Sequence, residues 1–429
     1  MTFRQTACAS SLIALIYGIA AARVCSKVVG EYKKEKKING TGKTWNYWCW
    51  NMGSGHTANI MAGKVPEVRI TAAADLRESR REWAKENMPE GTAIFEDGDS
   101  LIKSGTCDAV LIAVPHYDHP RLTILALENG LHVMCEKPAG VYTKQVREMN
   151  EAAEKSDRVF GMMFNQRTNC IYKKMHDMVQ SGDYGKLKRV NWIITDWYRT
   201  QAYYNSGGWR ATWDGEGGGV LLNQCPHNLD LLQWICGMPS KVRAFCHNGK
   251  WHDIEVEDDV TAYLEFPNGA TGVFVTTTAD APGTNRLEVT LEKGKLVAEN
   301  DELKFYELEI NEREYCYQAT EGFAKPPCHE TTLELDGKNP QHIGVLNAFA
   351  AAILRGEPLV ADGVEGIHGL ELSNAMHLSS WLEKPVSLPI DEDLFLEKLN
   401  EHRANSKKKE NVQDITFDTT GSYGSKTKE

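Results

Sequence analysis

The sequence has no C-x-x-C pair, no excess of positive charge and no long hydrophobic run. Its eleven cysteines show no spacing typical of zinc ligands, so we predict reduced thiols in a cytoplasmic protein. A formal net charge of -11 argues against nucleic acid as a partner. The apolar run from Leu12 to Ala22 is shorter than the ~20 residues that a helix needs to span a membrane, so we predict no membrane partner.

The composition is that of an ordinary globular protein, with 41% hydrophobic and 25% charged residues. A length of 429 residues suggests two domains. The densest group of potential metal ligands alternates like an edge strand, so we predict a solvated strand there and no metal site. This group comprises His252, Asp253, Glu255, Glu257 and Asp258.

The stretch 109–140 is the most informative part of the chain. Residues 109–115 form a continuous apolar run that is typical of a strand buried in a parallel sheet. A helix and a second short strand follow, and this strand leads into Glu136-Lys137-Pro138. A lysine at this point lies on the edge where open α/β sheets bind ligands, which makes Lys137 a candidate chemical centre. In isolation, a Glu-Lys pair more often consists of solvated loop charges.

A second block, Gly217-Gly218-Gly219 through His227 to Asp230, changes that balance. Together with Glu136-Lys137-Pro138 it makes the chain resemble the glucose-fructose oxidoreductase/inositol dehydrogenase (Gfo/Idh/MocA) family over roughly residues 51–389. The resemblance implies an α/β fold with an N-terminal Rossmann-type doubly wound parallel sheet. It also implies a C-terminal α+β domain with a large, mainly antiparallel open sheet, and an NAD(P)-dependent oxidoreductase that forms a homo-oligomer.

We therefore divide the chain into four parts. Residues 1–50 are an anomalous leader, and residues 51–167 form a dinucleotide-binding domain that lacks its normal first strand. Residues 168–395 form a substrate and oligomerisation domain. Residues 396–429 are polar and rich in lysine, and we predict a disordered tail.

The leader departs from the resemblance because no strand and no first two glycines precede Gly53. Back-translating Trp45 to Trp50 and reading one base later gives codons for Gly-Ile-Ile-Gly-Val-Gly, which completes G-x-G-x-x-G at Gly53. We hypothesise an out-of-frame translation of residues 1–50. The alternative is a genuine extension carrying a secretory signal, in which case export is expected and Trp48 and Trp50 would obstruct the pyrophosphate.

Several residues are predicted to bind the cofactor. Gly53 begins a helix whose N-terminal amides face phosphate, and Asp75 follows the next strand about twenty residues later, where it suits the ribose hydroxyls. An acid there favours NAD, although nearby Arg77 and Arg80 leave NADP open. The remaining candidates follow the two strands described above, and His116 replaces a residue that is usually Asn in the family. They are Pro115, His116, His119, Glu136, Lys137 and Pro138.

The catalytic candidates are Lys137, His227 and Asn223. The spacing of Asn223 and His227 predicts one helix face. The resemblance implies that His227 takes a proton from a hydroxyl while Lys137 stabilises the developing alkoxide. The family has Asp where this chain has Asn223, and a neutral amide can orient an imidazole but cannot stabilise an imidazolium. A lone helical histidine is otherwise more often structural.

Aromatic and arginine side chains concentrate between residues 197 and 213. Such surfaces stack on sugar rings and bind their hydroxyl groups, although core or dimer packing accounts for any one of them equally well. The predicted substrate-binding residues are Arg167, Tyr198, Trp209, Arg210, Asn223 and His227.

These observations predict oxidation of a secondary hydroxyl of a sugar, polyol or glycoside by hydride transfer. One alternative is a glycoside hydrolase that recycles NAD through transient C3 oxidation and elimination. Another is a non-catalytic sugar or dinucleotide sensor, against which the presence of both Lys137 and His227 argues.

Overall fold

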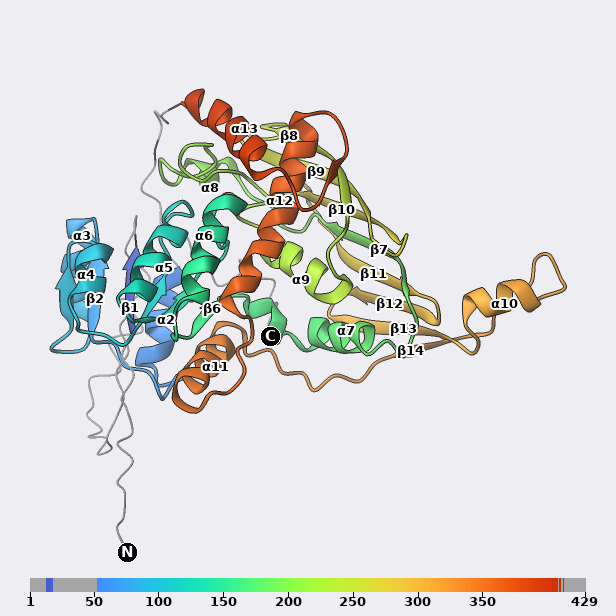
Figure 1. Cartoon of the computed structure of the whole chain (residues 1–429), viewed down its shortest axis with the longest axis horizontal. Coiled ribbons are helices and arrows are strands. Elements are labelled where there is room, and N and C mark those ends of the chain that lie inside the picture. The colour runs from blue at the N-terminus through green and yellow to red at the C-terminus, as the bar shows by residue number, and fades with distance from the viewer. Residues whose placement is uncertain (1–12, 18–51, 408, 410–411, 413–429) are drawn as a thin grey trace, which may run out of the picture.

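The structure is a computed structural model that describes residues 13–17, 52–407, 409 and 412. Two sheets organise the chain, and the candidate site lies where their domains meet (Figure 1). None of the helices in the described ranges is both long and apolar enough to cross a membrane.

The first sheet contains six parallel strands in the order β3-β2-β1-β4-β5-β6. This is the predicted doubly wound arrangement, and the runs that form β2 and β4 are buried along their whole length. The strands are β1 (Ile13–Tyr17), β2 (Ala72–Asp75), β3 (Ala93–Phe95), β4 (Ala109–Ile112), β5 (His132–Cys135) and β6 (Phe160–Met162).

Strand β1 comes from the leader, outside the residues 51–167 that were predicted to form this domain without its normal first strand. The structure places Ile13–Tyr17, part of the apolar leader run, between β2 and β4. Backbone N–H and C=O groups along the facing edges of β2 and β4 need partners, and an apolar pentapeptide in that gap supplies them. Residues 18–51, which include Trp48 and Trp50, lie outside the described residues.

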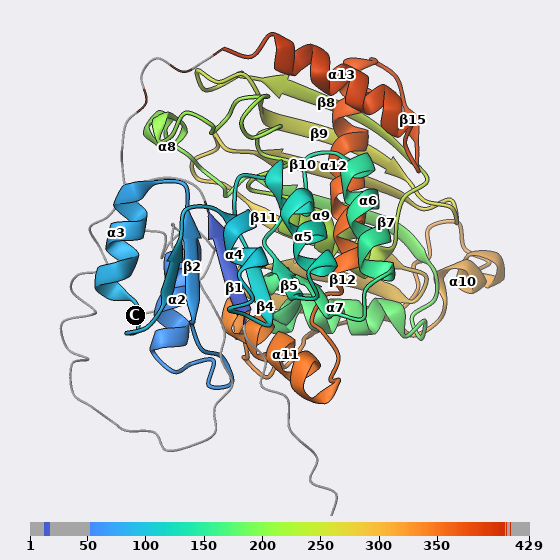
Figure 2. The same cartoon turned by 60° about the vertical axis from the view of Figure 1, so that its left-hand side comes forward.

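Helices lie on both faces of this sheet (Figure 2), so the alternating side chains of its strands face two helical layers. On one face, Val110 and Ile112 share a core with residues of α4, α5 and α6. On the other, Ala109 and Leu111 pack with residues of α3 and α11, so a late helix completes the first domain. The helices are α2 (Met52–Met61), α3 (Glu78–Asn87), α4 (Gly98–Lys103), α5 (Asp118–Glu128), α6 (Thr143–Glu154) and α11 (Gln341–Arg355).

The second sheet has nine strands in the order β14-β13-β12-β11-β7-β10-β9-β8-β15. All neighbours are antiparallel except β7 and β10. The predicted hairpin around Asn268-Gly269 is confirmed as β9 paired with β10. The strands are β7 (Leu187–Ile194), β8 (Lys241–Asn248), β9 (Glu257–Glu265), β10 (Thr271–Thr277), β11 (Asn285–Leu291), β12 (Gly294–Glu299), β13 (Glu302–Leu308), β14 (Cys328–Thr332) and β15 (Val386–Ser387).

Helices cover the side of this sheet that faces the first domain (Figure 1). Its other side exposes Ile193, Phe245 and Tyr263, and homo-oligomerisation stays a prediction. Residues 250–256 form a loop and β9 is an internal strand, so the predicted edge strand is wrong. The helices of this domain are η1 (Asn165–Thr168), α7 (Cys170–Gln180), α8 (Gln201–Asn205), α9 (Pro226–Cys236), α10 (Glu312–Gln318), η2 (Gly363–Glu365), α12 (Gly366–Trp381) and α13 (Glu392–Ala404).

The predicted tail boundary at residue 396 falls inside α13, where Phe395 and Leu399 are buried. Its apolar residues recur at a helical spacing of four, which the lysine-rich composition of the segment concealed. Beyond the helix, Ser406 and Lys409 contact the second domain. The predicted disorder is therefore wrong for residues 396–407, and residues 413–429 lie outside the described residues.

Candidate active site

Lys137 lies where β5 leaves the first sheet and reaches across to the second domain. Its Nζ donates a hydrogen bond of 2.9 Å to the backbone carbonyl of Asn223. Burial lowers the pKa of Lys137; Glu136 and Glu216 act in the opposite direction, while Arg210 and Arg199 lower it further. The predicted chemical centre is therefore a partly buried ammonium group at the carboxyl edge of the parallel sheet.

Glu136 is buried beside Lys137 and is held by α2. Its Oε1 lies 2.8 Å from Nε2 of His56, and its Oε2 accepts the backbone N–H of Lys137. Burial alone would raise the pKa of Glu136, but the contact with His56 and the charges around it hold that pKa at about 2. Glu136 is therefore a fixed anion that orients the loop carrying Lys137.

The two histidines after β4 have different surroundings. His119 is buried, and its two ring nitrogens lie 2.6 Å from the carbonyl oxygen of Pro138 and 2.8 Å from that of Val114. Since both nitrogens face backbone carbonyls, His119 joins the two strand ends and has no nitrogen left for a cofactor. Nδ1 of His116 lies 3.3 Å from the carbonyl oxygen of Glu216. His116 thus remains a candidate cofactor contact at the carboxyl edge of the parallel sheet, as does Pro115.

The prediction that Asn223 and His227 share a helix face is wrong. Helix α9 begins at Pro226, and Asn223 lies in the turn before it. Proline suits the first position of a helix because it has no N–H to donate, and it disfavours helical geometry in the residue before it. The side-chain amide of Asn223 consequently donates to Glu216 and does not orient His227.

His227 lies in the first turn of α9 and is 4% exposed. Neither of its ring nitrogens has a hydrogen-bond partner among the described residues. Burial lowers the pKa of His227 well below its ordinary value, and Lys137 and His342 add to this effect. At neutral pH the ring is therefore uncharged, with one nitrogen able to accept a proton.

Glu216 is a site residue that the sequence analysis missed. It is 1% exposed and accepts the Asn223 amide and the backbone N–H of Ala211. It directly precedes the triple glycine, where the chain must pass close to other backbone. A Cβ at Gly219 would lie 2.0 Å from the carbonyl oxygen of Glu257. That glycine run was the only local signal for this carboxylate.

The arginine and aromatic residues form a compact wall beside Glu216. The Arg210 guanidinium lies 4.4 Å from the ring centre of Tyr203 and 4.6 Å from that of Trp209, and Arg199 lies 5.2 Å from that of Tyr203. Tyr203 belongs to the aromatic stretch 197–213 that the sequence pointed to, although it was not singled out as a substrate ligand there. In contrast, the Tyr198 side chain is 49% exposed.

Arg167 was predicted to bind substrate, but its buried guanidinium is paired with two carboxylates, which favours a structural role. Its guanidinium donates 2.8 and 2.6 Å hydrogen bonds to the two carboxylate oxygens of Asp230 and a 2.6 Å bond to Glu365. Arg167 and Asp230 have side chains that are only 2% and 1% exposed. This bidentate pair fixes α9, and with it His227, against η1.

Asp75 is the last residue of β2, on the same carboxyl edge of the parallel sheet as Lys137 but several strands away. Its Oδ1 accepts a 2.6 Å hydrogen bond from the backbone N–H of Arg77, whereas its buried Oδ2 has no partner among the described residues. Burial raises the pKa of Asp75 to about 7, and Arg80 is one of the cations that oppose this effect. Gly53 lies in the first turn of α2.

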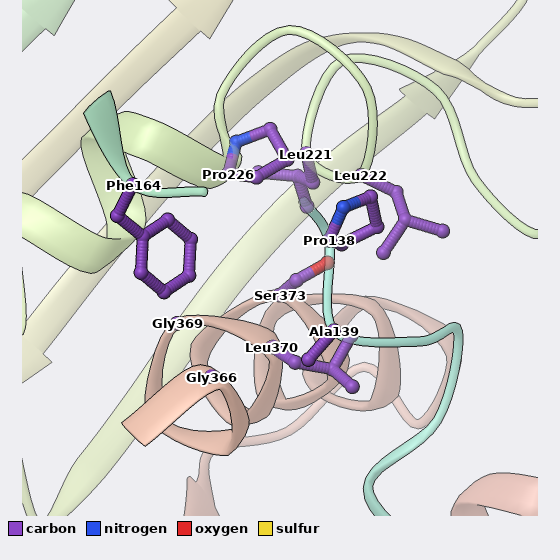
Figure 3. Close-up of a pocket in the computed structure, with 10 residues that line it drawn as sticks. All are labelled: Pro138, Ala139, Phe164, Leu221, Leu222, Pro226, Gly366, Gly369, Leu370 and Ser373. Carbon is purple, nitrogen blue, oxygen red and sulfur yellow. The ribbon is translucent and has the colours of Figure 1, made fainter. Parts of the chain in front are cut away.

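A small apolar pocket lies between Glu136-Lys137-Pro138, the start of α9 and α12 (Figure 3). Pro138, Pro226 and Leu370 line it, and Ser373 contributes a hydroxyl group. A sugar needs several hydrogen-bonding partners, so this pocket packs the loops of the site and is no sugar site. In the described ranges, no group of three or more acidic, histidine or cysteine side chains could hold a metal ion.

Comparison with known proteins decides the family. The model of the oxidoreductase family with an NAD-binding Rossmann fold matches residues 50–164, and that of the GFO/IDH/MocA C-terminal domain matches residues 172–297. The chain belongs to the Gfo/Idh/MocA family. It is thus an oxidoreductase with an NAD-binding domain, as the sequence predicted.

Three relatives illustrate the similarity. The chain is 25% identical over 347 residues to a myo-inositol 2-dehydrogenase of Thermotoga maritima, which covers 80% of this chain and 96% of that protein. It is 27% identical to a D-glucoside 3-dehydrogenase of Escherichia coli, over 47% of this chain and 61% of that protein. The WlbA dehydrogenase from Chromobacterium violaceum, solved with NADH and UDP-GlcNAcA, superposes with a TM-score of 0.69 at 25% identity, over 84% of this chain and 99% of that chain.

The described residues fit an NAD cofactor at its adenosine end. The partnerless, buried Oδ2 of Asp75 is an acceptor at the position where a ribose hydroxyl would donate. At the other end, Lys137 and His227 border the edge that a nicotinamide would occupy.

Proposed function

We propose that this family member oxidises a secondary hydroxyl of a sugar, polyol or glycoside, or catalyses the reverse reduction. The observation that carries the proposal is a buried, uncharged His227 with partnerless ring nitrogens in the same site as the Lys137 ammonium. A base and a cation placed together suit the removal of a hydroxyl proton and the stabilisation of the alkoxide that forms.

In this proposal, bound NAD supplies the hydride acceptor. One nitrogen of His227 takes the hydroxyl proton, and Lys137 donates a hydrogen bond to the substrate oxygen. Burial disfavours a charged imidazole at His227, which keeps the ring unprotonated before the reaction. The Arg167 and Asp230 pair holds the helix that carries this base.

The wall formed by Arg199, Tyr203, Trp209 and Arg210 supports a carbohydrate as the substrate. Aromatic faces pack on sugar rings, and guanidinium groups donate to their hydroxyls. The relatives named for myo-inositol and D-glucoside point in the same direction. Which sugar is accepted is a matter for experiment.

The test is a panel of polyols, free sugars and aryl glycosides, followed for both NADH and released aglycone. A dehydrogenase forms NADH in proportion to substrate consumed. Release of aglycone without net NADH would instead identify the NAD-recycling glycoside hydrolase. Saturable sugar binding with neither product would identify a sensor and contradict the proposal.

Lys137→Ala and His227→Asn separate catalysis from binding. We expect each to lower kcat about 10²- to 10⁴-fold, the range typical of a positioned acid or base. Lys144→Ala is the matched control, since Lys144 is an exposed lysine of α6 that forms an ion pair with Asp393 of α13. If turnover of every responsive sugar survives Lys137→Ala, the catalytic assignment fails.

A further inference from the structure

The carboxylate of Glu216 is joined to Lys137 through one intervening residue. The Asn223 side-chain amide donates to Oε1 of Glu216, while the Asn223 backbone carbonyl accepts the ammonium of Lys137. Glu216 also accepts the backbone N–H of Ala211. The position of Asn223, and therefore of the atom that holds Lys137, depends on this buried carboxylate.

Charges of both signs surround the ammonium group of Lys137. Arg199 and Arg210 face it as cations, and Glu136 and Glu216 face it as anions. Glu136 is already committed to His56. Three histidines, His116, His227 and His342, also border the ammonium, and burial lowers the pKa of each of them. Because uncharged imidazoles add no negative charge, Glu136 and Glu216 are the carboxylates that balance these cations, and Glu216 is the one that is joined to Lys137 through Asn223.

Arg210 is a second cation that interacts with the Glu216 carboxylate. Its Nη1 lies 3.8 Å from Oε1 of Glu216. Burial raises the pKa of Glu216, whereas Arg210, the Ala211 amide, Asn223 and Lys409 favour its ionised form. Arg210 packs against Tyr203 and Trp209, so the same carboxylate ties the charge at Lys137 to the proposed sugar-binding wall.

We propose that Glu216 is a positioning residue that keeps the Lys137 side chain protonated and in place through Asn223. This role rests on the proposed function of Lys137 as a cation that stabilises the substrate oxygen. The resemblance to the family places an acid where this chain has Asn223. Here the negative charge comes from a different position on the same loop, seven residues earlier.

Electrostatics determines the direction in which Glu216→Gln changes the pKa of Lys137. A carboxylate near an ammonium favours its charged form, so the neutral variant Glu216→Gln makes Lys137 lose its proton at lower pH. Activity that needs the ammonium then disappears at lower pH on the alkaline side of the pH profile. We expect a shift of about one pH unit, the low end of the one to three units that an adjacent opposite charge causes, because Asn223 lies between the two groups.

The measurement is direct labelling of Lys137 in the full chain with an amine-acylating reagent at a series of pH values, quantified by mass spectrometry of its peptide. The pH at which labelling is half-maximal gives the pKa of the Lys137 ammonium and does not require any turnover of substrate. We expect a lower midpoint in Glu216→Gln and a near-normal one in Glu216→Asp. In the double variant Glu216→Gln with Asn223→Asp, which returns the charge to the loop at position 223, the midpoint should rise again.

Glu255→Gln is the matched control, because Glu255 is a carboxylate of the neighbouring loop that binds Trp213 and Ser406 instead. An unchanged Lys137 midpoint in folded Glu216→Gln overturns the proposal. If that variant does not fold, Asn223→Ala takes its place, since it removes the amide that Glu216 holds. A midpoint equal to that of the unsubstituted chain would again overturn the proposal.

Labelling also separates this inference from the proposed function. If no sugar is turned over but Glu216→Gln shifts the labelling midpoint, the proposed function fails and the charge relation stands. If sugars are oxidised and the alkaline limb of kcat does not move in Glu216→Gln, only the role of Glu216 fails.

Discussion

At the scale of single residues, burial shifts the pKa values of the basic and the acidic groups of the site in opposite directions. It lowers the pKa of His227 and Lys137, which are charged when protonated, and it raises the pKa of Asp75 and Glu216, which are charged when deprotonated. Lys137, Asp75 and Glu216 therefore depend on specific partners to hold a charge, whereas burial alone keeps His227 uncharged. Such partners are what a sequence pattern cannot display.

Asp75 gives a pH-dependent prediction for cofactor binding. Its pKa of about 7 means that it is largely protonated below pH 7 and ionised above it. The ionised carboxylate accepts ribose hydroxyls more strongly, so the affinity for NADH should rise through pH 7 and fall by up to tenfold per pH unit below it. Titration of the chain with NADH between pH 5.5 and 8.5 measures this.

Asp75→Asn should flatten that pH dependence and weaken binding at pH 8 by about tenfold, the cost of one charge-assisted hydrogen bond. The matched control is Asp97→Asn, because Asp97 accepts hydrogen bonds from Ser100 at the start of α4. An Asp75→Asn variant that keeps the full pH dependence would show that Asp75 does not contact the cofactor.

At the scale of elements, apolar runs and turn residues identified strands and the β9–β10 hairpin correctly. Both depend on local patterns: continuous burial in a parallel strand and Asn268-Gly269 at a turn. The helix predicted to carry both Asn223 and His227 begins instead at Pro226, so Asn223 lies before it. The spacing rule holds only inside a helix.

The contacts that assemble the site are long-range, and the sequence did not reveal them. Lys137 and Asn223 meet only because the two domains bring their loops together, and Arg167 was assigned to a sugar because its partner Asp230 belongs to another element. Polar residues in loops have no period from which a partner could be deduced. The resemblance identified Lys137 and His227, whereas Glu216 required the structure.

The pair of Arg167 and Asp230 predicts a large loss of stability when one partner is removed. Arg167→Ala leaves the Asp230 carboxylate buried without its cation, which should lower the free energy of unfolding by about 3–5 kcal/mol. Replacing both residues, Arg167→Met with Asp230→Leu, should cost far less. Urea unfolding measures each variant, and Arg147→Ala is the control because its pair with Glu392 lies at the surface.

A loss of less than about 1 kcal/mol in Arg167→Ala, similar to the surface control, would contradict a structural role. It would then return Arg167 to the list of candidate substrate ligands.

The segment after α13 predicts an effect on substrate affinity. Ser406 donates a 2.5 Å hydrogen bond to Glu255, and Lys409 donates a 2.6 Å bond to the carbonyl oxygen of Tyr204, next to Tyr203 of the sugar-binding wall. Ending the chain after Asn405 should raise KM about two- to tenfold. Each of the two lost hydrogen bonds stabilises the substrate-ready position of this wall by about 0.5–1.5 kcal/mol. Removing only residues 413–429 is the control and should leave KM unchanged. Equal KM values for both truncations would contradict this role.

At the scale of the whole molecule, the site depends on both domains. Lys137 comes from the parallel sheet and His227 from α9 on the second sheet, while α11 from late in the chain completes the core of the first domain. The cofactor-binding edge and the substrate wall are therefore parts of one unit. What remains open is the start of the first domain.

Two hypotheses account for that start. In the structure, Ile13–Tyr17 supplies the central strand, and residues 18–51 separate it from α2. Connections between a strand and a helix in such domains are usually about 2–6 residues long, so this separation is unusual. In the shifted reading frame, a glycine turn immediately precedes Gly53, and the family match begins at residue 50, where that frame ends. The two hypotheses assign the first strand to different parts of the gene.

Sequencing the source DNA across codons 33–53 decides between them. A frameshift predicts codons at 45–50 that encode Gly-Ile-Ile-Gly-Val-Gly one base later, an ATG at the junction of codons 39 and 40, and a lost base near Asn51. A protein rebuilt in that frame should then bind NADH at least about 100-fold more tightly than the chain as written, because glycines let the backbone approach the pyrophosphate where Trp48 and Trp50 cannot. Returning tryptophan to the last rebuilt glycine before Asn51 is the control and should abolish the gain. If the codons cannot encode these glycines, the leader is genuine, and weak NADH binding would then be a natural property of this enzyme.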